Sequence, residues 1–547
     1  MQKIKNNSSH ILFLNLNVFL YLWFVLDLTL EKLSIAIGPG DITGTYMFQE
    51  LLWNRGMETD SFGFPTGVTV KELANYEVTQ TILVKAALFF TDNVFLAVNL
   101  GIYFSHFICA TVVFYVSRHI GISENLSMLS AFASATLPWI PGRTEHPGLW
   151  YLSIALIPFL LVNSSADKRG ILRALLLGVV VGASGGYVVA FAFVVLIGIV
   201  ASKILTSTFT LKEARIFGSF GAGVVLTSLS SLTFFGFGTT SSLLDRTLQD
   251  SIHYGGYFLL SFLPLPSTPL PLQLETKLGT LLNQLPELNE STWKSNFGSL
   301  ALICAVLILA FTALINAINK SQSRILFSND YWIKTVFIVS LTVFFFFVKG
   351  GLGPILTATI FPPIRGWNRL VIILQICVIL LAFVVLQYLS KGSKRVFVLL
   401  FGPLVLLQAV ANASLIPPSR ADYVSDVSRM VSDVERSLNS NCGILQLPEL
   451  KNDGSGAPKN LNTYDHYLPS TASKKMRWSF GQNPDDFIYR IDLSMSKSEV
   501  LQSLERGFCA IEIDLNWENS KAWVAKLESF NLAIIHDSKN FIVFALP

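Results

Sequence analysis

The feature that most limits what this chain can fold into is a series of apolar blocks, each of roughly 16–25 residues and long enough to cross a bilayer as a helix. Of its 547 residues, 52% are hydrophobic and only 14% are charged. Soluble domains contain about 25% charged residues. The sequence therefore predicts an α-helical polytopic membrane protein.

We interpret about 11 blocks as transmembrane spans, although VVVGASGGYVVAF within 171–203 could also be a bend in one long helix. The predicted spans are residues 11–29, 95–116, 122–139, 149–163, 171–185, 187–203, 216–237, 297–317, 333–348, 367–389 and 396–414.

The distribution of Lys and Arg tests this interpretation, because cytoplasmic loops are enriched in both. With the N-terminus in the cytoplasm, every predicted cytoplasmic loop is basic. A single helix over 171–203 would move the later basic loops outside, so two spans are favoured there. The basic residues are Lys3 and Lys5; Arg118; Lys168, Arg169 and Arg173; Lys203, Lys212 and Arg215; Lys320, Arg324 and Lys334; and Lys391, Lys394 and Arg395.

Three polar segments then share the extracytoplasmic side: the loop 30–94, the loop 239–296 and the tail 415–547. The first loop contains eight acidic and four basic residues. The N-terminal segment has a basic start and a long apolar run but lacks an A-x-A-like cleavage site. We therefore expect an uncleaved first span rather than a signal peptide.

The tail is predicted to form a small extracytoplasmic α/β domain, distinct from a transmembrane domain over 1–414. Cys442 and Cys509 lie in the tail and could pair in an oxidising compartment, or remain free thiols. Helices are expected at 421–440, 496–507 and 519–530, and strands at 442–450, 508–517, 531–538 and 540–547.

Asp41 is the first candidate for a chemical role, because it ends a Gly-Pro-Gly-Asp turn at 38–41, here called the GPGD turn. A carboxylate at the outer mouth of a span can act as a general base toward a hydroxyl acceptor, and the turn would fix its direction. Alternatively, Asp41 caps the helix ITGTYMFQELLW through its free N–H groups. The two roles are compatible.

A second pair of carboxylates, Glu58 and Asp60, lies farther along the same loop. Carboxylates at positions i and i+2 can bind a divalent cation, so this pair is a weak candidate metal site.

The outer loop PWIPGRTEHPGLW brings Arg143, Glu145 and His146 together between prolines. Arginine can bind a phosphate, and histidine can donate or accept a proton. Alternatively, this is an interfacial loop anchored in the membrane surface by Trp139 and Trp150. We favour a role in substrate binding.

Arg365 and Arg369, in FPPIRGWNRL, are four residues apart at the predicted outer end of a span, so a helix would place both on one face. Two guanidinium groups beside a helix N-terminus suit a phosphate at the membrane surface, and Lys349 could add a third positive charge. The alternative is a pair of arginines that reach lipid headgroups.

Several functions are not supported by the sequence. It contains no Walker loop, G-x-S-x-G, HExxH or paired CxxC motif. Its net charge of +4 includes no Lys/Arg block of the kind that binds nucleic acid.

The combined pattern resembles the GT-C superfamily, the multi-span glycosyltransferases that use polyprenyl-phosphate-linked sugars. The similarity rests on GPGD in an acidic first outer loop, FPTG after it, GRTEHPGLW, FPPIRGWNR and an outer C-terminal domain. The tail phrases LQLPEL, YDHYLPS, RWSFGQ and RGFCAIEID also look like those of bacterial membrane proteins of this type. The resemblance covers most of the chain.

The resemblance implies inverting transfer of a hexosyl or pentosyl group at the outer face of a bacterial cytoplasmic membrane, to a hydroxyl of a glycan, lipid or protein. It implies that Asp41 is the catalytic base and that Arg365 and Arg369 hold the lipid phosphate. Some members bind a metal through a D-x-D motif, whereas this chain has Glu58-Thr59-Asp60. A divalent cation is therefore a possible cofactor rather than an implied one.

Two other functions remain as alternatives: a transporter or flippase of a lipid-linked glycan, and a non-catalytic scaffold for envelope assembly. A transporter would need polar residues deep in several spans and repeat-related halves. The sequence shows few buried charges and no convincing internal repeat, which favours the glycosyltransferase.

Overall fold

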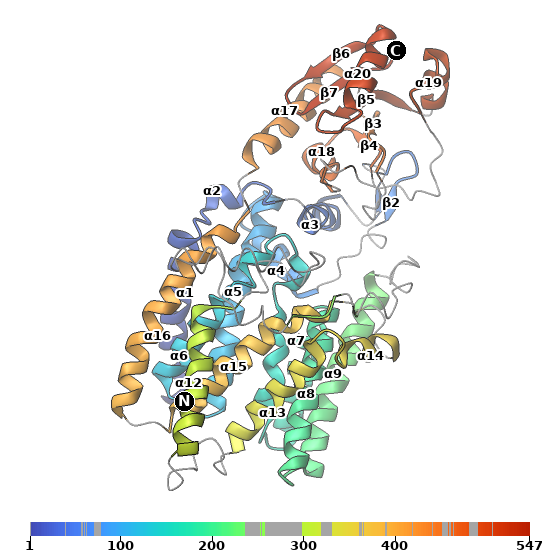
Figure 1. The fold of residues 1–547 in the computed structure, drawn as a ribbon. Coiled ribbons are helices and arrows are strands. Elements are labelled where there is room, and N and C mark those ends of the chain that lie inside the picture. Colours follow the sequence, from blue (N-terminus) through green and yellow to red (C-terminus); the bar gives the residue numbers. More distant parts are fainter. Residues whose placement is uncertain are drawn as a thin grey trace.

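The apolar blocks form helices that run side by side beneath a small domain built on a β-sheet (Figure 1). This arrangement is seen in a computed structural model. The structure describes residues 2–38, 40–55, 58–59, 61, 63–69, 78–235, 252, 254–257, 298–318, 331–359, 364, 366–388, 391–417, 420–439, 441–450, 458, 461–462, 464–480, 491–505 and 507–547.

The helical part follows the predicted spans closely. Labels with η mark its short π-helical and 3-10 helical segments. In chain order it contains α1 (Gln2–Leu20), η1 (Tyr21–Val25), α2 (Leu30–Leu33), α3 (Asp41–Glu50), η2 (Leu51–Arg55), α4 (Val78–Leu88), α5 (Val94–His119), α6 (Glu124–Ala135), η4 (Pro141–Arg143), η5 (Pro147–Leu149), η6 (Leu152–Leu161), α7 (Lys168–Gly182), α8 (Gly186–Leu205), α9 (Leu211–Phe235), α12 (Leu300–Ile318), α13 (Tyr331–Phe347), α14 (Gly353–Thr359), η11 (Trp367–Leu370), α15 (Val371–Leu386), α16 (Lys391–Ala411) and η12 (Asn412–Leu415).

Each predicted span overlaps a helical segment, but the number of membrane crossings stays a prediction. Within the described residues, 5 helices are long and apolar enough to cross a membrane. These five are Ser8–Val25, Val94–His119, Gly186–Leu205, Trp367–Leu386 and Arg395–Leu415. The shorter apolar helices are Val78–Leu88, Pro147–Leu161, Leu302–Thr312 and Tyr331–Phe347.

Two separate helices, α7 and α8, occupy the region 171–203. Between them Gly185 has a φ of 104°, which ends the first helix and reverses the chain. Lys203, near the end of α8, donates a hydrogen bond of 3.3 Å to Asn163, which lies just before α7. The two helices are therefore antiparallel, which confirms two helices over a single bent one.

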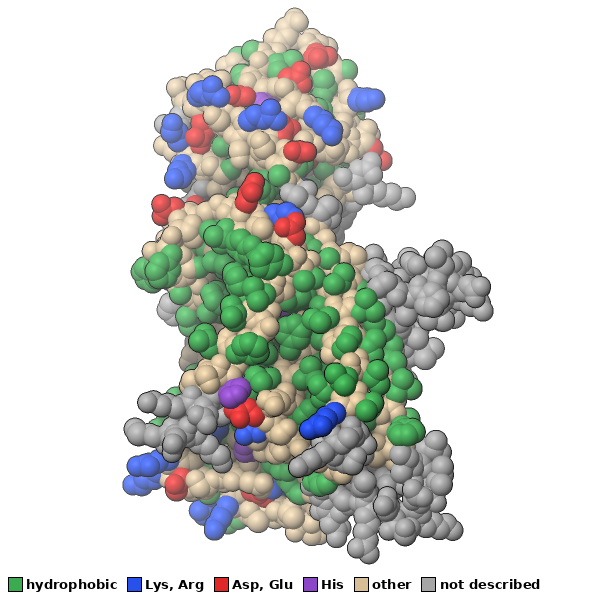
Figure 2. All heavy atoms as spheres, turned by 90° about the vertical axis from the view of Figure 1, so that its left-hand side faces the viewer, with side chains coloured by type: hydrophobic (Ala, Val, Ile, Leu, Met, Phe, Trp, Pro, Cys, Tyr) green, Lys and Arg blue, Asp and Glu red, His purple; other side chains and the backbone are tan. Residues whose placement is uncertain are grey.

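The centre of the helical part is α15, which packs against α6, α12 and α13. Its residues are almost all apolar and almost all buried, as expected for a helix surrounded by other helices. On the outside, Figure 2 shows a broad apolar belt, with charged side chains above it in the C-terminal domain and at the opposite end. Exposed belt residues include Leu399 and Leu400 of α16.

The C-terminal domain contains a 5-stranded sheet with strand order β4-β3-β5-β7-β6. β3 is parallel to β4 and β5, whereas β7 is antiparallel to β5 and β6. The elements are α17 (Ala421–Ser437), β3 (Gly443–Leu447), α18 (Tyr467–Ala472), β4 (Arg477–Trp478), α19 (Lys497–Leu504), β5 (Phe508–Asp514), α20 (Ser520–Ser529), β6 (Ala533–Asp537) and β7 (Phe541–Ala545).

Alternating side chains of the sheet build two cores. Ile444 and Val543 face the core shared with α17, whereas Leu445 and Ile511 face the core shared with α19 and α20. Each helix and strand expected from the tail sequence is confirmed, and α18 and β4 were not predicted.

The first outer loop is joined to this sheet at β4. β1 (Glu58–Thr59) and β2 (Val68–Thr69) form an antiparallel hairpin. Trp478 N–H donates to Ser61 C=O at 2.9 Å, and Phe64 N–H donates to Trp478 C=O at 3.1 Å. The tip of the hairpin therefore extends the sheet beyond β4 by backbone hydrogen bonds.

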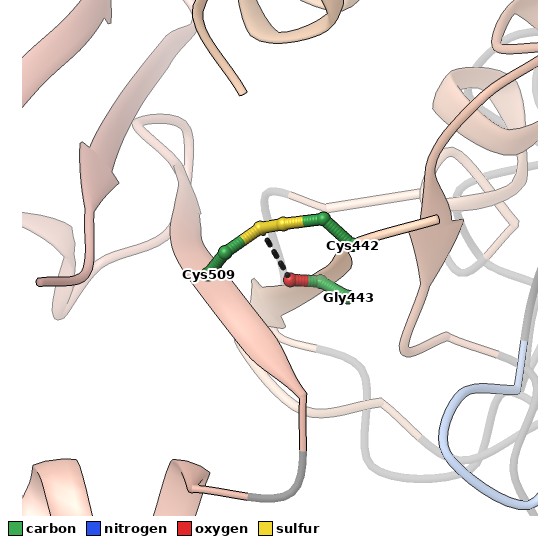
Figure 3. Close-up of a disulfide and its surroundings, with 3 residues drawn as sticks. All are labelled: Cys442, Gly443 and Cys509. Atoms are coloured by element: carbon green, nitrogen blue, oxygen red, sulfur yellow. Dashed lines mark hydrogen bonds between the residues drawn. A yellow bond between two sulfur atoms is a disulfide. The ribbon is translucent and has the colours of Figure 1, made fainter. Parts of the chain in front are cut away.

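Phe64 is the side chain that anchors this tip, and it is 5% exposed. Its ring lies edge-on to Phe508, with centroids 5.0 Å apart. Beside it, Cys442 and Cys509 form a disulfide between the residue before β3 and a residue of β5, with Cα atoms 5.9 Å apart (Figure 3). The pairing that the sequence left open is thus present.

Candidate functional site

The GPGD turn is held from below by α3 and α5. Tyr46 of α3 accepts a hydrogen bond from Ile37 N–H and donates one of 2.6 Å to Asn99 of α5. Asn99 in turn donates to the carbonyls of Leu33 and Ile35. These buried hydrogen bonds fix the segment that leads into the turn.

Asp41 is the first residue of α3, and its side chain is 53% exposed. Gly40 is the N-cap, so the prediction that Asp41 caps this helix is wrong. The carboxylate still lies at the positive end of the helix dipole. His146 Nδ1 donates to Asp41 Oδ2 at 2.8 Å, which orients the carboxylate while leaving it accessible to a substrate.

Glu145 fills the space beneath the turn. Its carbonyl accepts a hydrogen bond of 3.0 Å from Ile42 N–H. A Cβ atom at Gly38, where φ is +65°, would lie 2.8 Å from Glu145 Oε1. Gly38 therefore serves to admit this side chain as well as to form the turn.

Burial raises the pKa of the Glu145 carboxyl. The charges of His146, Arg420 and Arg143 act in the opposite direction, and that of Asp41 reinforces the rise. The carboxyl thus lies among His146 and Arg143 of its own loop, Asp41 of the first outer loop and Arg420 of the C-terminal domain.

Arg143 is fully buried, with its guanidinium 5.0 Å above the ring of Trp139. Its carbonyl accepts a hydrogen bond of 3.0 Å from Trp150 Nε1. Both tryptophans are almost completely buried, so the alternative that they anchor the loop at the membrane surface is wrong. The two tryptophans instead hold Arg143, one through its guanidinium and the other through its carbonyl.

A second group of candidates lies between α8, α13 and η11. The Arg369 guanidinium stacks 4.5 Å from the ring of Tyr187, at the start of α8. Lys349, just after α13, is exposed and donates a hydrogen bond of 3.3 Å to Tyr257. Asn368, the neighbour of Arg369, donates its backbone N–H to the carbonyl of Tyr254. Arg369 and Lys349 therefore both lie beside residues 254–257 of the second outer loop.

The two groups lie at the same end of the helices and are connected through α4. Gln49 of α3 donates to Thr81 of α4 at 3.3 Å. At the start of α4, Thr79 is 3.0 Å from Ser184, which lies three residues before Tyr187. No direct contact between Asp41 and Arg369 is seen in the described part of the chain.

Three predicted site residues have no described side chain. Arg365 and Asp60 lie outside the described residues, and of Glu58 only the backbone in β1 is described. The roles proposed for them stay predictions. Among the residues that the structure does describe, no cluster of three or more His, Cys, Asp or Glu could hold a metal ion.

Arg420 is the residue at this site that sequence reasoning missed. It directly precedes α17 and hydrogen-bonds the Gly38 carbonyl of the GPGD turn at 3.4 Å. No local pattern identifies its contact with the turn, because Gly38 is 382 positions earlier in the chain.

The whole arrangement, with a helical membrane part and an α/β domain above the first outer loop, is the fold of the GT-C glycosyltransferases. ArnT from Cupriavidus metallidurans, bound to undecaprenyl phosphate, matches with a TM-score of 0.56 and 11% identity, over 98% of this chain and 97% of that chain. Its apo state matches with a TM-score of 0.50 and 12% identity, over 98% of both chains.

The arabinofuranosyltransferase AftD from Mycobacteria also matches, with a TM-score of 0.50 and 12% identity, over 98% of this chain and 41% of that chain. No protein-family model and no curated protein sequence matches the chain. At these identities the likeness is one of fold.

Proposed function

We propose that this protein transfers a sugar from a polyprenyl-phosphate donor to an acceptor hydroxyl at the outer face of a bacterial cytoplasmic membrane. The observation that carries the proposal is the exposed Asp41 carboxylate, oriented by His146 beneath the C-terminal domain. The match in fold to ArnT, which was crystallised with undecaprenyl phosphate, supports a lipid-linked donor.

In this proposal Asp41 is the general base. It accepts the proton of the acceptor hydroxyl while the acceptor oxygen bonds to the anomeric carbon of the sugar. The bond between that carbon and the phosphate oxygen breaks, and the polyprenyl phosphate leaves with the bonding electron pair. His146 holds the carboxylate in the direction of the acceptor, and Arg143 and Glu145 support the loop that carries it.

The leaving phosphate gains negative charge, which cations stabilise in the transition state. Arg369 and Lys349 are the described residues that we assign to this role, with Arg365 as a third. A polyprenyl donor cannot leave the bilayer at low cost, because each buried CH₂ contributes about 0.8 kcal/mol. The proposal therefore requires these cations to lie at headgroup depth. The contacts of Arg369 at the start of α8 and of Lys349 just after α13 support this.

The assignment of sides follows from charge and redox chemistry. Basic loops at the end opposite the sheet domain indicate a cytoplasmic face. The Cys442–Cys509 disulfide is typical of an oxidising compartment, which supports an extracytoplasmic position for residues 415–547. Residues 1–414 would then form the membrane part, with a cytoplasmic N-terminus.

The test is transfer by purified protein in lipid nanodiscs, supplied with radiolabelled polyprenyl-phosphate sugars and a panel of acceptors. Asp41→Asn should insert and fold but lose roughly 10²–10⁴-fold in kcat. Asp27→Asn is the matched control, because Asp27 is another exposed aspartate on the same side and pairs with Lys32. Full activity of Asp41→Asn would remove Asp41 as the base, and no transfer by wild type would refute the function.

A further inference from the structure

Arg420 occupies the junction between the helical part and the C-terminal domain. It follows η12 and is the N-cap residue of α17. Its guanidinium makes two parallel hydrogen bonds to Asp465, Nη1 to Oδ1 and Nη2 to Oδ2, both 2.7 Å long. It also lies 4.5 Å from the ring of Tyr423. The two parallel bonds between Arg420 and Asp465 are the strongest form of an arginine–carboxylate pair.

The partners of Arg420 are themselves fixed by the domain. Asp465 is 4% exposed and accepts a further hydrogen bond of 3.2 Å from Asn462. Tyr423 donates to Asp514 of β5 at 3.2 Å. The guanidinium therefore has a position set by the sheet domain rather than by its own side-chain torsions.

The same guanidinium also reaches the first outer loop. Its Nη1 donates to the Gly38 carbonyl at 3.4 Å. Its charge also acts on Glu145, which packs against Gly38, and on Tyr46, which holds the segment before the turn. A single planar fork thus contacts the domain on one side and the GPGD turn on the other, which a lysine could not do.

We propose that Arg420 is a positioning residue, which fixes the GPGD turn and hence the direction of Asp41 only while the C-terminal domain is docked. The inference rests on the proposed function, because it assigns a partner to the same base. Gly38 is three residues from Asp41, so a shift of its carbonyl moves the carboxylate. A misplacement of about 1 Å can lower an enzymatic rate roughly 100-fold.

A charge-swap experiment separates this role from simple attachment of the domain. Arg420→Ala should lower kcat at least tenfold with little change in the KM of the donor, in line with the misplacement above. The double variant Arg420→Asp, Asp465→Arg restores an ion pair at the junction but places no guanidinium beside Gly38. It should recover thermal stability without recovering kcat.

Arg436→Ala is the matched control, since Arg436 is also on α17 and pairs with Asp433 on its exposed face. It should behave as wild type. Recovery of kcat by the charge swap, or wild-type kcat in Arg420→Ala, would overturn the proposal.

A readout that does not depend on turnover is hydrogen–deuterium exchange of a peptide covering residues 38–50. Exchange there should rise in Arg420→Ala and in the charge swap, and stay unchanged in Arg436→Ala. Unchanged exchange in Arg420→Ala would refute the positioning role even if wild type transferred no sugar. A rise in exchange with no transfer by wild type would refute the proposed function alone.

Discussion

Gly38→Ala should disturb the GPGD turn in two ways, by straining its backbone and by overpacking against Glu145. The residue has a φ of +65°, and alanine in this left-handed region costs about 1–2 kcal/mol. The new Cβ would also lie 2.8 Å from Oε1 and 2.9 Å from Cγ of Glu145. Overpacking of this kind costs about 1–3 kcal/mol.

Together these terms predict a local loss of roughly 2–5 kcal/mol, which the turn relieves by moving away from Glu145. Because Ile42 N–H is bonded to the Glu145 carbonyl, the start of α3 moves with it. We therefore expect kcat to fall by about 100-fold for a displacement near 1 Å, with the protein still inserted and folded.

The matched control is Gly44→Ala on α3, the helix that follows the turn. No atom lies within 4 Å of a Cβ built at Gly44, and alanine in a helix interior stabilises by about 0.5–1 kcal/mol relative to glycine. The assay combines thermal unfolding in nanodiscs with transfer kinetics at saturating donor. Equal losses in both variants, or full activity in Gly38→Ala, would refute the idea that the fit between the turn and Glu145 sets the geometry of Asp41.

Two further predictions concern the C-terminal domain. Phe64→Ala should weaken docking of the hairpin tip by about 3–5 kcal/mol, because the Phe64 ring is buried against Phe508. Limited proteolysis should then cut the first outer loop faster than in wild type, and an unchanged cleavage rate would contradict this. Burial, and then the charge of Asp514, raises the pKa of the Glu512 carboxyl to about 8, so the folded state binds this proton more tightly than the unfolded chain. The folding stability that comes from this bound proton is lost as pH rises from the ordinary glutamic acid range through about 8. Glu512→Gln should therefore melt at a higher temperature than wild type at about pH 9 but not at about pH 5. The same difference in melting temperature at both pH values would contradict this prediction.

The parts of the fold that the sequence predicts are those that depend on local periodicity. Long apolar blocks became helices, and the alternating tail segments became the strands β3, β5, β6 and β7. The basic loops correctly separated α7 from α8. Each of these signals is complete within about 20 residues, so no knowledge of distant contacts is needed.

The parts that the sequence does not predict depend on contacts between distant segments. The Gly-Pro-Gly sequence marks a turn, but nothing in it shows that Glu145 occupies the space under Gly38. Asp41 looked like a helix cap because its true partner, His146, is 105 positions away. Arg420 and β4 are not predicted from the sequence, because each contacts a first-loop segment that lies hundreds of positions earlier.

The pairing of the hairpin tip with β4 has a consequence for biosynthesis. The loop that carries Asp41 leaves the ribosome early. Trp478, whose backbone forms hydrogen bonds with Ser61 and Phe64 of this loop, is made near the end. A product truncated before β4 would have a hairpin tip without these backbone partners. The first outer loop can therefore complete its fold only after β4 has been synthesised.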